Sequence, residues 1–439
     1  MHKGSFDQAS SMGSLPPASQ DRFNRQRIAA SMCSLALWCL TAFATSLPKG
    51  LLPFAVLMLI STLLAPEVLY RHIRDIRVPL LLIVSVLVMA STVMLLSIRR
   101  FDLNLGAMEN HARLLAIPWC MLWVYASAPS KTRLWQGAML GIAATCALTV
   151  WQTMTGTVRA SGWNKNAIVF ADTLLMVIVI ALFCTPRGRW PWTMAVTCLG
   201  ALALVLTGTR SAWIGLLLVL CVFLLTGRWA TPGKRVALTV LGLALAVTAL
   251  TLIPGLNQRV RIVELKQDIA RYEQGDIQSS SGLRLERLHV AAQAVAAHPL
   301  TGVGLGQFDK GAMVRALPEC QDSQEERCGM GHAHNDLAEW AATMGIPGAL
   351  ALIAIYLAPF LIFIRQMRRI PETQRWRSAA MTGAMLVLVF AFCGMTQSMF
   401  AHQLTAVIYP ATVGVVLGLA LRESAASTVR IVRYPERHW

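Results

Sequence analysis

The chain has 439 residues, of which 55% are hydrophobic and 14% are charged, and its mean hydropathy is +0.54. Soluble domains carry about 25% charged residues, so the composition excludes an ordinary soluble protein and predicts an all-α, polytopic membrane protein. The formal net charge is +17, but the basic residues cluster between apolar runs, and the pattern indicates no nucleic-acid partner.

Apolar runs near the roughly 20 residues that a membrane-spanning helix needs recur along the chain. We predict twelve spans, of which the second and the eighth are short, at 28–47, 51–69, 78–98, 112–129, 134–153, 167–185, 190–207, 211–227, 236–253, 337–364, 378–397 and 403–421. They divide the chain into a tail at 1–27, nine spans within 28–253, a large loop at 254–336, three spans within 337–421 and a tail at 422–439.

The distribution of basic residues predicts the orientation. Arg and Lys are abundant in both tails and in the loops on the same side as the tails, and they are sparse in the short loops on the other side. The positive-inside rule therefore makes both termini cytoplasmic and places the loop 254–336 outside. Residues 1–27 are polar and lack a cleavage-site pattern, which predicts a disordered tail followed by an uncleaved signal anchor.

Two arginines lie in outer connections of the first half of the chain. Arg210 lies between the seventh and eighth spans, in a connection so short that its guanidinium must lie at the membrane boundary. A charged group there is costly and indicates function, and its planar fork suits a lipid diphosphate. The alternative is snorkelling to lipid phosphates. For Arg159, between the fifth and sixth spans, a structural role is favoured.

The loop 254–336 is predicted to contain helices. Val260–Gln274 has apolar residues at helical spacing, and Gly275 would end that helix. Ser279–Ser281 offers an N-cap for a second helix, from about Leu283 to Ala297, which His298-Pro299 would end.

Two arginines and a glycine-rich turn belong to this part of the loop. Arg284 and Arg287 are three residues apart and share a side of the second helix, where an arginine is more often solvated than catalytic. The segment Gly302–Gly306 has the spacing of a dinucleotide loop, but no strand precedes it. We expect a turn in which glycine lets backbones approach closely.

Two cysteines lie near the end of the loop. Cys320 and Cys328 are separated by seven polar residues, and in an oxidising compartment they could form a disulfide. The ring would be short, so the gain in stability would be on the order of 2–3 kcal/mol. Two free thiols are the alternative.

Two histidines, His332 and His334, lie where the loop meets the tenth span. Histidine is suited to proton transfer near neutral pH. Asp336 is predicted to cap the helix, with Glu339 completing a capping box, so the helix dipole would favour a neutral His334. A structural histidine is one alternative. A metal site of His332, His334 and Asp336 is another, but its alternating spacing suits a strand.

Two further histidines on the outer side, His289 and His402, are expected to be structural.

Five motifs in a fixed order resemble those of one family. They are Thr209-Arg210-Ser211, Ser281-Gly282-Leu283-Arg284, the segment from His298 to Phe308, His332-Ala333-His334-Asn335-Asp336-Leu337 and Met344-Gly345-Ile346-Pro347-Gly348. This pattern resembles the O-antigen ligase family of Gram-negative bacteria, within a wider group of O-antigen polymerases and pilin O-oligosaccharyltransferases. The resemblance covers roughly 200–350.

The resemblance implies a GT-C-like fold in the inner membrane and a reaction at its periplasmic face. O-antigen would pass from undecaprenyl diphosphate to lipid A–core, without nucleotide or metal cofactor. His334 corresponds to the family's essential histidine, and Arg210 and Arg284 correspond to its two arginines. The match at Arg284 has Arg287 as a near neighbour, and His332, Arg287 and Arg159 are expected to give support.

Three other functions stay open from the sequence. An O-antigen polymerase or a protein O-oligosaccharyltransferase would use the same donor. A lipid-linked glycan transporter would instead carry ionisable residues near the bilayer midplane. The sequence predicts membrane lipids as surroundings and no particular oligomeric state.

Overall fold

The computed structural model describes residues 17–227, 231, 233–237, 240, 271, 274, 279–320, 328, 329 and 331–433, and the helices below are those of the described part. They are α1 (Pro17–Phe43), α2 (Leu52–Leu64), α3 (Glu67–His72), η1 (Arg74–Ile76), α4 (Arg77–Arg100), η2 (Leu105–Met108), α5 (Glu109–Ala112), η3 (Arg113–Leu115), α6 (Ala116–Ser127), α7 (Thr132–Met154), α8 (Ala167–Phe183), α9 (Trp190–Thr207), α10 (Arg210–Thr226), α14 (Ser280–Ala297), η4 (Phe308–Met313), α15 (Val314–Ala316), η5 (Pro318–Cys320), α16 (Asp336–Arg368), α17 (Glu372–Arg375), α18 (Ala379–Gly394), η6 (Met399–Ala401) and α19 (Gln403–Arg433).

The chain is a helical, polytopic membrane protein, and no strand occurs among the described residues. Six helices, α1, α4, α7, α9, α16 and α19, contain stretches long and apolar enough to cross a membrane, and α2, α8, α10 and α18 are shorter apolar helices. Each predicted span other than 236–253 and 51–69 overlaps a single apolar helix, and the span 51–69 covers α2 and the start of α3. The span 236–253, like the helix predicted at Val260–Gln274, lies mostly outside the described residues.

The ends of the first and last spans differ from the prediction. α1 begins at Pro17, inside the tail that was expected to be disordered, and α19 continues to Arg433, beyond the predicted end at 421. An apolar run marks where lipid can cover a helix, whereas helical hydrogen bonding can continue through polar residues such as Arg22 and Arg25.

Two kinds of helix make up the bundle. Every side chain of α8 from Val169 to Phe183 is buried, and α7, α9, α10 and α18 pack against it. A helix that is apolar on nearly every face is expected in such a central position. By contrast, α4 exposes Leu81, Val88 and Leu96, as a helix that faces lipid would.

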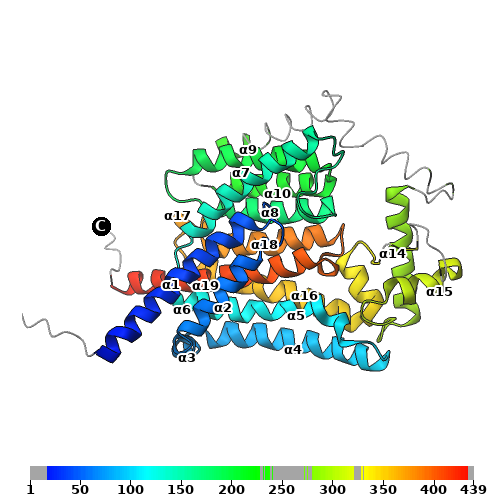
Figure 1. Cartoon of the computed structure of the whole chain (residues 1–439), viewed down its shortest axis with the longest axis horizontal. Coiled ribbons are helices and arrows are strands. Elements are labelled where there is room, and N and C mark those ends of the chain that lie inside the picture. The colour runs from blue at the N-terminus through cyan, green and yellow to red at the C-terminus, as the bar shows by residue number, and fades with distance from the viewer. Residues whose placement is uncertain are drawn as a thin grey trace, which may run out of the picture.

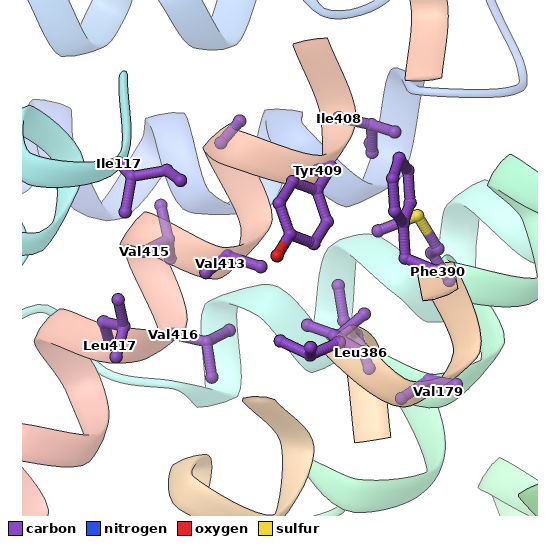
Figure 2. Close-up of a cluster of buried hydrophobic side chains, with 14 of the residues drawn as sticks. Ile117, Val179, Leu386, Phe390, Ile408, Tyr409, Val413, Val415, Val416 and Leu417 are labelled. Atoms are coloured by element: carbon purple, nitrogen blue, oxygen red, sulfur yellow. The ribbon is translucent and has the colours of Figure 1, made fainter. Parts of the chain in front are cut away.

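Paired glycines bring helices close together within the bundle. A Cβ atom at Gly414 or Gly418 of α19 would lie 2.7 Å from a backbone oxygen of α6, so only glycine permits this approach. Nearby, Tyr409 of α19 and Phe390 of α18 lie with ring centroids 4.3 Å apart. Figure 2 shows side chains from α6, α8, α18 and α19 meeting in this core.

A smaller unit, which we call the outer lobe, consists of α14, η4, α15 and η5. Figure 1 shows α14 and α15 at one end of the bundle, opposite the start of α1 and the end of α19. The lobe has its own apolar core, which includes Val290, Phe308 and Met313 and also takes in Ala333 and Ala342 beside the bundle. As predicted, the N-cap of α14 is in Ser279–Ser281: it is Ser279, whose side chain accepts the Gly282 N–H, and the helix ends at Ala297 with His298 as its C-cap. The helix begins at Ser280, three residues before the predicted start near Leu283.

The glycine-rich turn ties the outer lobe to a break in α16. Gly345 has φ 70° and ψ −167°, and Pro347 has no N–H, so the carbonyls of Ala342 and Thr343 lose their helical donors. The N–H groups of Val303 and Gly304 donate to those carbonyls at 3.0 and 2.9 Å. The predicted close approach is therefore present.

Gly302 makes this contact possible. Its φ is +61°, and a Cβ atom there would lie 2.3 Å from the carbonyl carbon of Thr343. In return, the N–H of Ile346 donates to Pro299 at 2.7 Å. Two of the sequence motifs, 298–308 and 344–348, thus meet to hold the lobe against the bundle beside the histidines.

Candidate functional site

The start of α16 differs from the predicted capping box. Asn335, not Asp336, is the N-cap, and its side chain accepts the Ala338 N–H at 2.9 Å. Asp336 is buried and accepts the Tyr356 hydroxyl at 2.8 Å, while Glu339 accepts the Ala333 N–H at 2.6 Å. Asn and Asp cap helices equally well. The hydrogen bond from the buried Tyr356 hydroxyl keeps the Asp336 side chain inside the bundle, and Asn335 is the residue that caps the helix.

His334 is held in an unusual backbone conformation. Its φ is +55°, in the left-handed region that costs a residue with a side chain about 1–2 kcal/mol. Its Nδ1 lies 2.7 Å from Oε1 of Gln397, an oxygen that also accepts the Ser398 N–H at 3.2 Å. Since a carbonyl oxygen can only accept, Nδ1 carries the proton and the lone pair is on Nε2.

A third histidine joins the predicted pair. The ring centroids of His332 and His334 are 4.3 Å apart, and those of His332 and His402 are 5.0 Å apart. Burial lowers the pKa of all three, and repulsion from its neighbours lowers that of His332 further. Three imidazoles this close to one another are therefore neutral at pH 7.

Three arginines gather on the same side of the molecule. Burial lowers the pKa of Arg284, and repulsion from Arg210 and then Arg159 lowers it further, while Asp172 raises it. Arg159 donates from Nε to the Thr207 carbonyl at 3.1 Å and approaches Thr209 at 3.4 Å. The structure thus brings together all three arginines that the sequence proposed from separate connections.

Of these three arginines, Arg284 lies close enough to act on His334. Burial lowers the pKa of His334 to about 4, and Arg284 is the next largest cause. Hydrogen bonding to Gln397 opposes this shift. A neutral imidazole beside a group of guanidiniums can accept a proton next to a bound anion.

Arg287 has a different position from Arg284, although both lie on α14. Its side chain is 0% exposed, and it donates to Asp309 at 3.1 Å and to the carbonyl of His332 at 2.8 Å. Its guanidinium also lies 5.9 Å from the ring centre of Phe308. Arg287 therefore holds the backbone of the histidine segment against η4. Arg284, by contrast, is the α14 arginine that lies near Arg210 and Arg159.

Other predicted residues have simpler positions. Cys320 and Cys328 are joined by a disulfide with a Cα–Cα distance of 5.2 Å. His289 is exposed and pairs with Gln293 at 2.9 Å.

The metal alternative of His332, His334 and Asp336 is not formed. Asp336 accepts a hydrogen bond from Tyr356, and no group of three side chains that could hold a metal ion occurs among the described residues.

Sequence reasoning missed Gln397, Asp172 and the proximity of His402 to the pair. Gln397 lies 63 positions from His334, and no local pattern marks it. A polar residue in the apolar stretch of α8 was the available signal for Asp172, since such residues are costly and indicate function.

Comparison with known proteins gives two results. Residues 194–353 match the family model described as O-Antigen ligase, which confirms the resemblance and includes Arg210, Arg284 and His334. An uncharacterized protein of Haemophilus influenzae (strain ATCC 51907 / DSM 11121 / KW20 / Rd) is 24% identical over 246 residues, which make up 56% of this chain and 61% of that protein. The chain thus matches less than two thirds of that relative.

Proposed function

Since residues 194–353 form an O-antigen ligase family domain, we propose that this protein is an inverting glycosyltransferase that moves O-antigen from undecaprenyl diphosphate to lipid A–core. The observation that carries the proposal is a neutral His334, oriented by Gln397 and placed beside Arg284. A base next to a phosphate-binding group is what attack by a sugar hydroxyl on a lipid diphosphate requires.

The donor diphosphate would bind at the arginine group. Arg210 and Arg284 can each present a planar fork to phosphate oxygens. Arg210 is also the first residue of α10, and the side chain of Thr209 does not cap that helix. The backbone N–H groups at the start of α10 can therefore contribute to anion binding. Arg159 holds this turn in place through Thr207 and Thr209.

The proposed reaction is a single displacement. Nε2 of His334 accepts the proton of an acceptor hydroxyl while the hydroxyl oxygen bonds to the anomeric carbon of the donor. The bond from that carbon to the diphosphate oxygen breaks, and its electron pair leaves with undecaprenyl diphosphate from the opposite face, so the configuration inverts. Arg210 and Arg284 stabilise the charge on the leaving group. No step requires a metal or a nucleotide.

Donor binding would also strengthen the base. In the free protein Arg284 helps to lower the pKa of His334 to about 4. A diphosphate bound to Arg284 offsets that positive charge, so the pKa of His334 would rise toward its ordinary value of about 6.5. The imidazole would become a better proton acceptor only after the donor is in place.

We place the outer lobe at the periplasmic face of a bacterial inner membrane, with twelve spans, both termini cytoplasmic and a GT-C-like arrangement. The excess of basic residues in both tails supports this orientation. The position of the lobe opposite the start of α1 and the end of α19 is consistent with it (Figure 1).

A reconstituted reaction tests the function. Purified protein in lipid nanodiscs is given undecaprenyl-diphosphate O-antigen with lipid A–core, with pilin or with no acceptor, and products are separated by mass. We expect product only with lipid A–core. Polymer from donor alone would identify an O-antigen polymerase, and glycosylated pilin a protein-directed transferase. Passage of donor across vesicle membranes, with no product, would identify a transporter.

A further inference from the structure

A cavity of about 270 Å³ lies between η2 and α5, the Gly302–Gly306 turn and the first turns of α16. It is slightly smaller than the range of about 300–1,000 Å³ typical of drug-sized ligands, which suits one sugar ring. We infer that this cavity, here called the acceptor cavity, binds the terminal sugar of the saccharide acceptor. The inference rests on the proposed function.

The acceptor cavity differs from the arginine group in its polar side chains. Its wall contains Glu109, Asp336 and Glu339, and neither arginine nor lysine. Glu109 pairs with Arg113 at 2.6 Å, and Asp336 accepts the Tyr356 hydroxyl at 2.8 Å. The wall therefore has no cation to bind a diphosphate, and it offers oxygens that can accept hydrogen bonds from the hydroxyl groups of a neutral ligand.

Glu339 offers the most direct contact for a sugar hydroxyl. One of its carboxylate oxygens accepts the Ala333 N–H at 2.6 Å, and no described residue donates to the other. The side chain is half-buried in the cavity wall. A sugar hydroxyl in the cavity could donate a hydrogen bond to this oxygen.

Aromatic rings close the inner side of the cavity. The rings of Trp340 and His111 lie 5.2 Å apart, and Trp340 and Phe400 lie 5.7 Å apart. At the rim, Gly306 and Gly331 have no atom within 4 Å of where a Cβ would lie. The cavity thus combines carboxylate acceptors, an apolar wall and an open rim, which suits the hydroxyls and C–H faces of a sugar.

The acceptor cavity borders the segment that carries the proposed base. Gly331 and Asp336 line the cavity, and they flank His332–His334 in the chain. Glu339, also in the cavity wall, accepts the N–H of Ala333 between the two histidines. A sugar in the cavity would therefore lie beside the backbone of the segment that carries His334.

Two substitutions test the acceptor cavity. Ala107→Trp fills it from η2, and the matched control, Ala112→Trp, adds the same ring at an exposed position of α5 outside the lining. Glu339→Gln keeps an oxygen for the Ala333 N–H but replaces the other oxygen with an NH2 group, which cannot accept a hydrogen bond. We expect Ala107→Trp and Glu339→Gln to raise the KM for lipid A–core about tenfold or more, with donor KM unchanged. Ala112→Trp should leave both unchanged.

The outcomes separate this inference from the proposed function. If wild type forms no product with lipid A–core, the proposed function fails. If wild type is active while both cavity variants keep its acceptor KM, or raise donor and acceptor KM alike, the acceptor cavity is wrongly assigned. Should Ala107→Trp fail to fold, ligand-observed NMR with lipid-free core oligosaccharide decides: binding to wild type, weakened in Glu339→Gln, supports the inference, and equal binding overturns it.

Discussion

The bundle and the outer lobe are stabilised in different ways. The bundle has a continuous apolar core that runs through α8, α18 and α19. The lobe has a small core, and its attachment depends on backbone hydrogen bonds from the glycine-rich turn and on Arg287. Burial of apolar surface is spread over many side chains, whereas the attachment of the lobe depends on a few polar contacts.

The candidate site lies at the interface between the bundle and the outer lobe. Arg210, Gln397 and His402 come from the bundle side, Arg284 comes from the lobe, and His334 lies in the connection between them. A small shift of the lobe would therefore separate Arg284 from Arg210 without unfolding the bundle. Changes in the lobe should lower activity before they lower the stability of the bundle.

The largest expected effect on transfer comes from removing His334, the proposed base at the interface between the bundle and the lobe. His334→Ala should lower transfer by about 10²–10⁴-fold, because the acceptor hydroxyl would lose its proton acceptor. His289→Ala, on the exposed face of α14, is the control and should retain activity. Transfer by purified variants with matched thermal unfolding is the measurement. A fully active His334→Ala would remove His334 from the mechanism.

The second prediction separates two arginines one turn apart on α14. Arg284→Lys should lower transfer about 100-fold with little change in stability, since a lysine has no fork for phosphate. Arg287→Met should lower the stability of the lobe by on the order of 3 kcal/mol, because Oδ1 of the Asp309 carboxylate and the His332 carbonyl lose the hydrogen bonds from Arg287. Hydrogen exchange along α14, measured with activity, distinguishes them. Equal exchange in both variants would contradict the division of roles.

The third prediction tests the attachment of the lobe. Gly302→Ala places a methyl group against Thr343, so it should shift the turn and lower transfer about tenfold, within the 10²-fold that a 1 Å misplacement can cost. Gly188→Ala has a similar positive φ with nothing within 4 Å and measures backbone strain alone. If the two variants were equally active, the close approach would not matter for the site.

The smallest effect is a shift in pH dependence without loss of turnover. Protonated His334 cannot accept a proton, so activity should fall as pH falls through its pKa, which is about 4 in the free protein. The acid limb of kcat/KM for the donor reports the pKa of His334 in the free protein, and the acid limb of kcat reports its pKa in the complex with the donor. Because the bound diphosphate raises the pKa of His334, the acid limb of kcat should lie at higher pH.

Arg284→Gln provides the internal check on that shift. Removing the positive charge should move the acid limb of kcat/KM upward, toward about 6.5, because Arg284 is the largest electrostatic cause of the low pKa. Burial, the largest cause of the low pKa, would remain, as would Arg287 and His402, so the shift should be partial. An unchanged limb would mean that another group titrates.

The sequence determined the parts of this protein that depend on near neighbours. Apolar runs located α4, α7 and α9 to within a few residues, because helix formation and lipid burial respond to local composition. Ser279 and His298-Pro299 likewise set the ends of α14, since caps act over three or four residues.

Only the tertiary structure decided which side chains meet. Whether Asn335 or Asp336 caps α16 depended on Tyr356, and the choice of Arg284 over Arg287 depended on Asp309 in η4. Gln397 reaches His334 across 63 positions. Such partners are selected by the packing of distant helices, which no local pattern encodes, and so the sequence could name the residues of the site but not their partners.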